Sequence, residues 1–135
     1  MEVEITINLT AALVAAVASF VLGGIWYGPA FGKRWQALVG LSDDDIASGG
    51  HPAKIFAGAF VLTLIQAVML SAVIPAEPDM EVGLVYALVI GISFVATAFG
   101  VNYLFSRSPG TLFLIDGGYN VLQFALMGAI IGAFG

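Results

Sequence analysis

The chain has 135 residues, of which 60% are hydrophobic and only 10% are charged, with a formal net charge of −5. A soluble domain of this size needs more polar surface, so the composition predicts an integral membrane protein. The acidic balance argues against a nucleic-acid partner, and the absence of cysteine excludes disulfides, thiolate metal sites and thiol catalysis.

Four segments reach the ~20 apolar residues that a helix needs to cross ~30 Å of hydrocarbon. They use most of the chain, so residues 1–135 are predicted to form one all-α transmembrane domain, a four-helix bundle made of two hairpins. The first segment follows acidic residues and continues past a possible cleavage site, so we interpret it as retained rather than as a signal peptide. The expected spans are about 7–27, 55–74, 82–105 and 111–134.

The first span carries small residues at intervals of four, Ala15, Ser19 and Gly23. Such a stripe lets another helix approach closely, either within the chain or from a second subunit. Trp26 and Tyr27 close the span, because their amphipathic rings suit the headgroup level, and the following Gly-Pro pair is expected to stop the helix.

After the first span, the apolar residues fall on one face of a helical pattern and the basic residues fall on another. This pattern predicts a short helix lying in the cytoplasmic interface. The apolar face consists of Phe31, Trp35, Leu38 and Val39, and the polar side consists of Lys33, Arg34 and Gln36.

Ser42 precedes three aspartates, 43–45, as an N-cap precedes the acidic first turn of a helix. A cation site is the alternative interpretation, but consecutive aspartates point in different directions on a helix. His51 lies in the loop that follows and has no second ligand near it in the sequence, so we assign no metal site.

The basic residues all lie in or beside the first and third connections, whereas the other side of the membrane receives only acids. By the positive-inside rule, these connections are cytoplasmic and both termini are outside, in the inner (cytoplasmic) membrane of the cell. The basic residues are Lys33, Arg34, Lys54 and Arg107, and the outer acids are Glu2, Glu4, Glu77, Asp79 and Glu81.

The second and third spans are joined by a short turn at 75–81, which predicts that they pack as an antiparallel hairpin. The turn at 108–110 predicts a second hairpin, between the third and fourth spans. Thr63 and Gln66 are polar groups in the second span that need partners. The third span has a small-residue stripe of Gly83, Ala87 and Gly91.

The last span combines length with polarity, because Asp116, Asn120 and Gln123 fall within a sector of roughly 60° on a helix. Ionisable groups in hydrocarbon are costly and usually face a bundle interior or a water-filled cavity. We expect Asp116 to be ionised and to contact Asn102, Lys54 or Arg107. A separate face carries Gly117, Ala125, Gly128 and Gly132.

This polar seam predicts a cytoplasm-facing site that binds or transports a small polar or cationic molecule. The alternative is a structural or assembly scaffold whose polar groups only satisfy one another, and a membrane enzyme is the third possibility. No catalytic residue is assigned, and no cofactor is identified. The candidate binding residues are Asp116, Asn120, Gln123, Asn102, Gln66, Tyr119 and Trp26.

Two alignments of the chain with itself suggest an internal duplication. A shift of 57 positions places Gln66 on Gln123, and a shift of 76 places residues 24–27 on residues 100–103. The two halves would have the same orientation, so their axis would lie along the membrane normal. Asp116 falls opposite Ala59 and belongs to the second half alone.

We also expect a homo-oligomer in the bilayer, most simply a dimer, because the chain has more small-residue faces than one slender bundle needs. Gly128 and Gly132 are the residues predicted to form its interface.

Several motifs resemble the DUF1761 family of small four-helix prokaryotic membrane proteins. The resemblance covers nearly the whole chain and implies a fold and a membrane location but no activity. The family is expected to have a histidine in the last span, where this chain has Asn120. It is also expected to have an acid after residue 105, where this chain has Ser106. Both differences weaken a role as a proton relay. The motifs are residues 24–29 with 31–33 and Trp35, then 102–105, 112–119 and 127–132.

Overall fold

The computed structural model describes residues 5–49 and 52–135, and within these ranges it is helical, with no strands. Four helices are long and apolar enough to cross a membrane. The predicted residues Glu2, Glu4 and His51 lie outside the described ranges. The spans are Leu9–Ala30 (α1, Leu9–Ile25, with η1, Trp26–Ala30), Pro52–Val73 (α4), Met80–Phe105 (α5, Met80–Ile90; η2, Gly91–Ala96; α6, Thr97–Phe105) and Gly110–Phe134 (α7).

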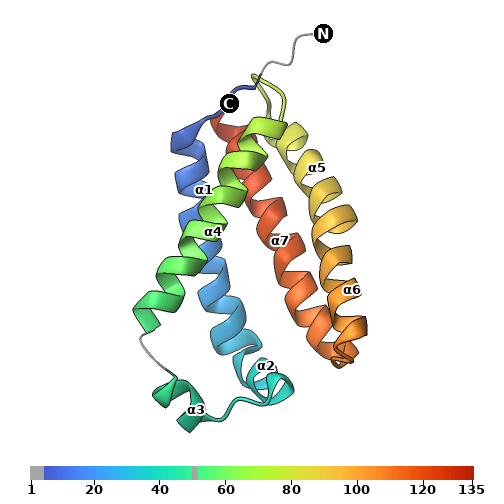
Figure 1. Cartoon of the computed structure of the whole chain (residues 1–135). Coiled ribbons are helices and arrows are strands. Elements are labelled where there is room, and N and C mark those ends of the chain that lie inside the picture. The colour runs from blue at the N-terminus through green and yellow to red at the C-terminus, as the bar shows by residue number, and fades with distance from the viewer. Residues whose placement is uncertain (1–4, 50–51) are drawn as a thin grey trace.

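The spans form a four-helix bundle, as predicted, and they pair in two hairpins. The first pairs α1 with α4, and the second pairs α5, η2 and α6 with α7. α7 also packs against α1, so it lies between the two halves (Figure 1). The start of α1, the α4–α5 connection and the end of α7 lie at one end of the bundle, and α2 (Gly32–Val39), α3 (Asp43–Ser48) and the α6–α7 turn lie at the other.

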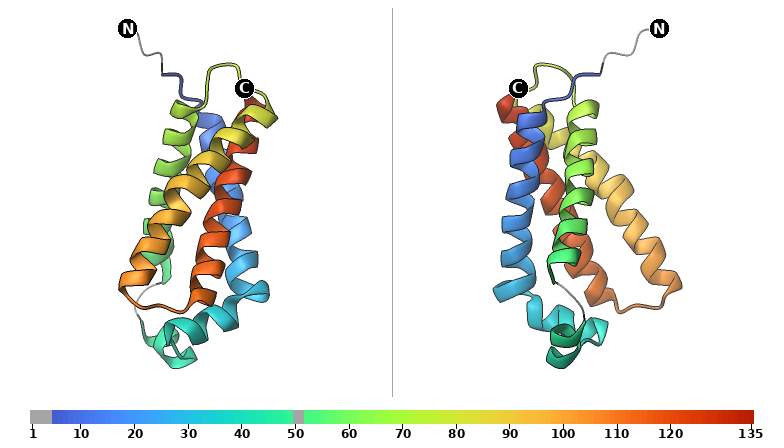
Figure 2. Two further views of the ribbon diagram at one scale, coloured as in Figure 1. Left: turned by 90° about the vertical axis from the view of Figure 1, so that its right-hand side faces the viewer. Right: turned by 60° about the vertical axis from the view of Figure 1, so that its left-hand side comes forward.

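The predicted packing of the second span against the third is wrong. α4 makes its main contacts with α1, and α5 makes its main contacts with α7. α4 and α5 meet at their connection and diverge from there, as Figure 1 and the right-hand view of Figure 2 show. α5 instead packs closely on α7, where Gly83 meets Gly128.

The first span does not stop at Gly28-Pro29, as the sequence predicts, but continues to Ala30 in a wider π-helical turn. The backbone N–H of Phe31 donates to the carbonyl of Trp26 at 2.8 Å, five residues back. This wider turn accommodates Pro29, which has no N–H of its own to donate. The extra turn determines where Trp26 and Tyr27 point.

Polar side chains cap three of the helices. Asn8 Oδ1 accepts from the backbone N–H of Ala11 at the start of α1, and Asp79 Oδ1 accepts from Val82 at the start of α5. Ser42 caps α3 as predicted, in a capping box with Asp45. The backbone N–H of Ser42 donates to the Asp45 carboxylate at 2.9 Å, which lowers the pKa of that carboxyl.

Small residues set the closest helix contacts. α1 buries alanines and Ser19 against its neighbours. α5 and α7 approach until Gly83 meets Gly128, and Gly132 meets the backbone of Asp79. The prediction that Gly128 and Gly132 form a subunit interface is therefore wrong, because both residues pack within the chain.

The outer surface of the bundle is apolar. Phe105 is 86% exposed and Leu104 is 80% exposed, and large hydrophobic side chains are exposed along all four spans. A surface of this kind suits acyl chains, since hydrocarbon solvates it without cost. The protein is a membrane protein in which lipid covers most of the apolar side chains.

The position of the basic residues yields a test of topology. Lys33 and Arg34 lie in α2, Lys54 lies in the first turn of α4 and Arg107 lies in the α6–α7 turn, all at one end. We predict that this end is cytoplasmic. Because the chain contains no cysteine, single cysteines can be labelled without background.

In intact cells a membrane-impermeant maleimide should label Ala76→Cys and spare Ser106→Cys, whose side chains are both exposed. Permeabilised cells, in which both should react, supply the control. Protection of Ala76→Cys together with labelling of Ser106→Cys would show that the orientation is the reverse of the predicted one. Labelling of both in intact cells would contradict the placement of these two residues on opposite sides of the membrane.

The contact between α5 and α7 yields a second test. A Cβ at Gly128 would collide with Ala87 and with the carbonyl of Gly83. Gly128→Ala should therefore lower the free energy of unfolding in mixed micelles by ~1–3 kcal/mol. Gly58→Ala is the matched control, because a Cβ at Gly58 meets nothing within 4 Å, and it should be neutral or slightly stabilising. Equal losses in the two variants would contradict this account.

Candidate functional site

Asp116 is the buried acidic residue of the described ranges, with 7% of its surface exposed. It lies in the second turn of α7, and its carboxylate accepts two hydrogen bonds. The Tyr27 hydroxyl donates to Oδ1 at 2.6 Å from η1, and the Tyr103 hydroxyl donates to Oδ2 from α6. We call Asp116, Tyr27 and Tyr103 the Asp116 cluster, and it joins the first, third and fourth spans.

The expected partners of Asp116 are corrected by this geometry. Within the described part of the chain, both side chains that bond its carboxylate are tyrosines rather than Asn102, Lys54 or Arg107. Asn102 and Lys54 are exposed. Adjacent residues on a helix point ~100° apart, so α6 can direct either Asn102 or Tyr103 toward α7, and it directs Tyr103.

The inner part of the predicted seam is also engaged. Asn120 Nδ2 donates to the backbone carbonyl of Asp116 at 2.8 Å, and Gln123 Nε2 donates to Gln66 Oε1 at 3.2 Å. Gln123 is buried, with 3% of its surface exposed. In the described ranges every buried side-chain nitrogen and oxygen has a hydrogen-bond partner. The seam therefore consists of two separate sets of contacts, one around Asp116 and one between the glutamines.

Two other candidate residues bind backbone groups across the α1–α7 interface. Trp26 Nε1 donates to the carbonyl of Ile115 at 3.0 Å, and the Tyr119 hydroxyl donates to the carbonyl of Ser19 at 3.1 Å. Each satisfies a buried polar tip while its ring packs between the helices. Trp26 and Tyr119 thus tie α1 to α7 on the flank of the Asp116 cluster.

The short helix α2 is linked to the same cluster through aromatic contacts. The Tyr27 ring meets Trp35 edge-on at 5.7 Å between centroids and meets Tyr119 at 5.2 Å. Edge-to-face pairs at these distances are favourable. The Trp35 face of the predicted interfacial helix therefore packs on Tyr27.

Tyr27 and Tyr103 were not among the candidate residues, although one sequence signal singles them out. The shift of 76 positions that aligns residues 24–27 with residues 100–103 places Tyr27 on Tyr103. A pair of equivalent phenols, set against one buried carboxylate, could have suggested the contact. The separation of 89 residues between Tyr27 and Asp116 gives no such indication by itself.

Asp116 lines neither of two cavities of ligand size found among the described residues. One, of about 360 Å³, lies at the opposite end of the bundle. The other, of about 400 Å³, is apolar and open, and Trp26 is the candidate residue that borders it. Among the described residues no group of three His, Cys, Asp or Glu could hold a metal ion. The apolar cavity is lined by Trp26, Ala96, Phe113, Leu114, Gly117, Gly118, Val121 and Leu122.

The tyrosine contacts give a direct test. Tyr27→Phe and Tyr103→Phe each remove one donor from a buried carboxylate and keep the ring, so each should lower the free energy of unfolding by ~1–3 kcal/mol. Tyr86→Phe is the control, because Tyr86 is an exposed phenol on α5. Thermal unfolding in one detergent measures all three. A cost for Tyr86→Phe as large as the others would show that the Asp116 contacts contribute nothing specific.

Comparison with known sequences places the chain in a family. No curated protein and no solved structure matches it. A family model described as "Protein of unknown function (DUF1761)" matches residues 10–132. The match runs from the first turn of α1 to the last turns of α7 and so includes all four spans. The chain therefore belongs to the DUF1761 family.

Proposed function

We propose that the chain is a single-domain structural or assembly protein of the inner membrane, with both termini outside. The observation that carries the proposal is that both carboxylate oxygens of Asp116 are taken by hydroxyls from two other spans. A carboxylate used in this way holds helices together. Its neighbours Asn120, Gln123 and Gln66 are likewise bonded within the chain.

The position of the cluster explains what it stabilises. The α5–α7 contact is closest near Gly83 and Gly128, toward the end where α7 finishes. Tyr103 and Asp116 join α6 to α7 near the other end, and Tyr27 adds α1. Each end of the bundle is thus stabilised by a different contact, close packing of small residues at one end and hydrogen bonds to the buried carboxylate at the other.

A second function is supported by the charge of the cluster. The two donors to Asp116 are neutral hydroxyls, so they stabilise the carboxylate but do not cancel its charge. A small cation bound beside Asp116 would supply the compensating positive charge. The seam of Asp116, Asn120 and Gln123 would then bind or transport a small polar or cationic molecule from the cytoplasmic side.

Homo-oligomerisation, most simply as a dimer, stays a proposal. Gly128 and Gly132 are used inside the chain, so a partner subunit would need another surface. The open apolar groove beside Gly117 and Gly118 is one surface of α7 that such a partner could use. Small residues let helix backbones approach closely in a membrane, which supports association at this groove.

Asp116→Asn distinguishes the two functions. The amide keeps the size of the side chain but removes the charge. If the residue is structural, the variant should unfold at a lower temperature in detergent, and native mass spectrometry should find the same bound species as in the wild type. If the residue binds a cation, the fold should survive and a bound mass present in the wild type should disappear. Asp44→Asn, in exposed α3, is the control and should change neither.

A further inference from the structure

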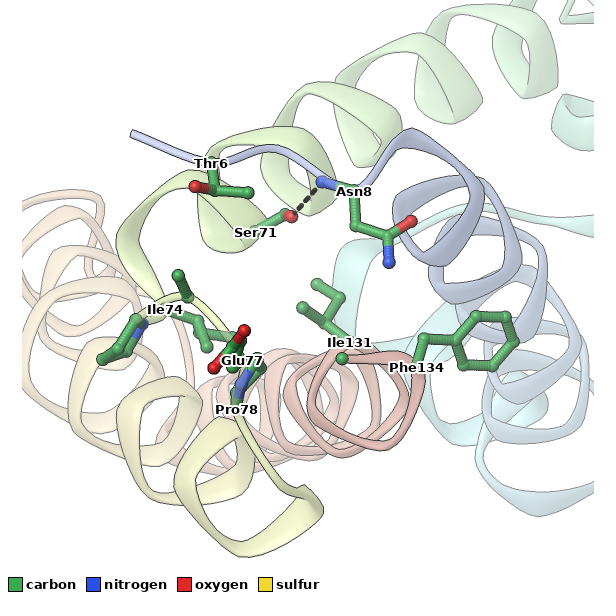
Figure 3. Close-up of a pocket in the computed structure, with 11 residues that line it drawn as sticks. Thr6, Asn8, Ser71, Ile74, Glu77, Pro78, Ile131 and Phe134 are labelled. Atoms are coloured by element: carbon green, nitrogen blue, oxygen red, sulfur yellow. Dashed lines mark hydrogen bonds between the residues drawn. The ribbon is translucent and has the colours of Figure 1, made fainter. Parts of the chain in front are cut away.

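The cavity of about 360 Å³ takes no part in the proposed function. We call it the end pocket, and it lies where the start of α1, the end of α4, the α4–α5 connection and the end of α7 meet (Figure 3). Its volume is within the usual range for small-molecule sites. It is separated from the Asp116 cluster by the length of the bundle, so an inference about it is independent of that site.

The end pocket combines polar groups with an apolar wall. Figure 3 shows Glu77, Asn8 and Thr6 around one space, with Ile74 and Ile131 beside it. A few convergent polar groups set against an apolar surface are typical of a small-molecule site.

One side of the pocket is held in place by hydrogen bonds. The backbone N–H of Asn8 donates to Ser71 Oγ at 2.9 Å, which fixes the start of α1 to the end of α4. Ser71 is buried, with 4% of its surface exposed. Asn8 Oδ1 accepts from Ala11, so the carboxamide oxygen is occupied and the orientation of the side chain is fixed. The amide NH₂ group of Asn8 remains as the donor end of that side chain.

The opposite side is held by packing. Pro75 and Pro78 restrict the connection, and Gly132 lets the backbone of Asp79 lie directly on α7. Glu77, between these residues, adopts a φ of +54°, in the left-handed region that favours glycine. A glycine would adopt this backbone with less strain but would bring no carboxylate to the pocket.

The charges at this end favour a cation. Glu77 lines the pocket, and Asp79 follows it at the start of α5. All four basic residues of the chain lie in elements at the other end. The field of one sign attracts a cationic molecule and repels an anionic one.

We propose that the end pocket binds a small organic cation, a primary or a quaternary alkylammonium ion, with the Glu77 carboxylate as its counter-charge. The exposed apolar lining of Pro75, Ala76 and Phe134 receives the carbon part of the molecule, and Asn8 and Thr6 contribute polar contacts at the rim. Ca²⁺ and Mg²⁺ take about six or more oxygen ligands and favour several carboxylates, whereas Glu77 is the carboxylate that lines the pocket among the described residues. With the topology inferred from the basic residues, the pocket opens to the outside.

The test uses the full chain in lipid nanodiscs. Ethylammonium chloride and tetramethylammonium chloride are titrated at constant ionic strength and followed by calorimetry, with calcium chloride as the metal comparison. At least one ammonium ion should bind the wild type saturably. Glu77→Gln should weaken that binding about tenfold or more, since it removes a charge-assisted contact. Glu81→Gln removes an acid at the same end but outside the pocket lining, and should leave the affinity unchanged within about twofold.

A second variant separates a binding defect from a folding defect. Glu77→Gly suits the positive φ, so it should unfold at a temperature no lower than the wild type and still bind as weakly as Glu77→Gln. The proposal is overturned if neither ammonium ion saturates the wild type, if both Glu77 variants bind as the wild type does, or if calcium binds and the ammonium ions do not. None of these outcomes bears on the Asp116 cluster, whose variants are tested separately.

Discussion

Two tyrosine hydroxyls donate hydrogen bonds to the Asp116 carboxylate. The packing of the helices at the end of the bundle that we propose to be cytoplasmic depends on this interaction. A buried carboxylate without partners would be strongly unfavourable in a bilayer, so the helices that bring Tyr27 and Tyr103 to it are constrained in rotation and depth. Tyr27 also packs against Trp35, which extends the constraint to α2. One side chain on α7 thereby sets the relative positions of four helical segments.

The two ends of the bundle are stabilised by different physics. Near the end of α7, Gly83 and Gly128 bring two backbones together, and the stabilisation comes from van der Waals contact over a short distance. Around Asp116 the helices are held further apart by large rings, and hydrogen bonds at the tips of those rings supply the specificity. This division suits a membrane, because the hydrophobic effect provides little force between helices that lipid already solvates.

The sequence predicts the spans well because hydrocarbon thickness imposes a length and a composition on each of them. It also predicts the cap at Ser42 and the burial of Asp116 inside the bundle, since both follow from local chemistry. Most of the errors concern contacts between distant elements. Asn102 and Tyr103 are equally plausible partners until the rotation of α6 is known, and Gly128 suits an internal contact as well as an external one. The π-helical turn at Pro29 was missed because Gly-Pro ordinarily ends a helix.

The duplication stays a prediction, and it bears on which residues meet. Gln66 and Gln123, equivalent under the shift of 57, bond to each other, as residues beside a two-fold axis do. Tyr27 and Tyr103, equivalent under the shift of 76, bond to the same carboxylate. The packing departs from symmetry, however, because α7 lies against α1 whereas α4 diverges from α5. Asp116 has no counterpart in the first half, where Ala59 stands at the equivalent position. A single carboxylate that collects both tyrosines can account for that departure, because it draws the first and third spans toward α7 and leaves α4 with no equivalent attraction.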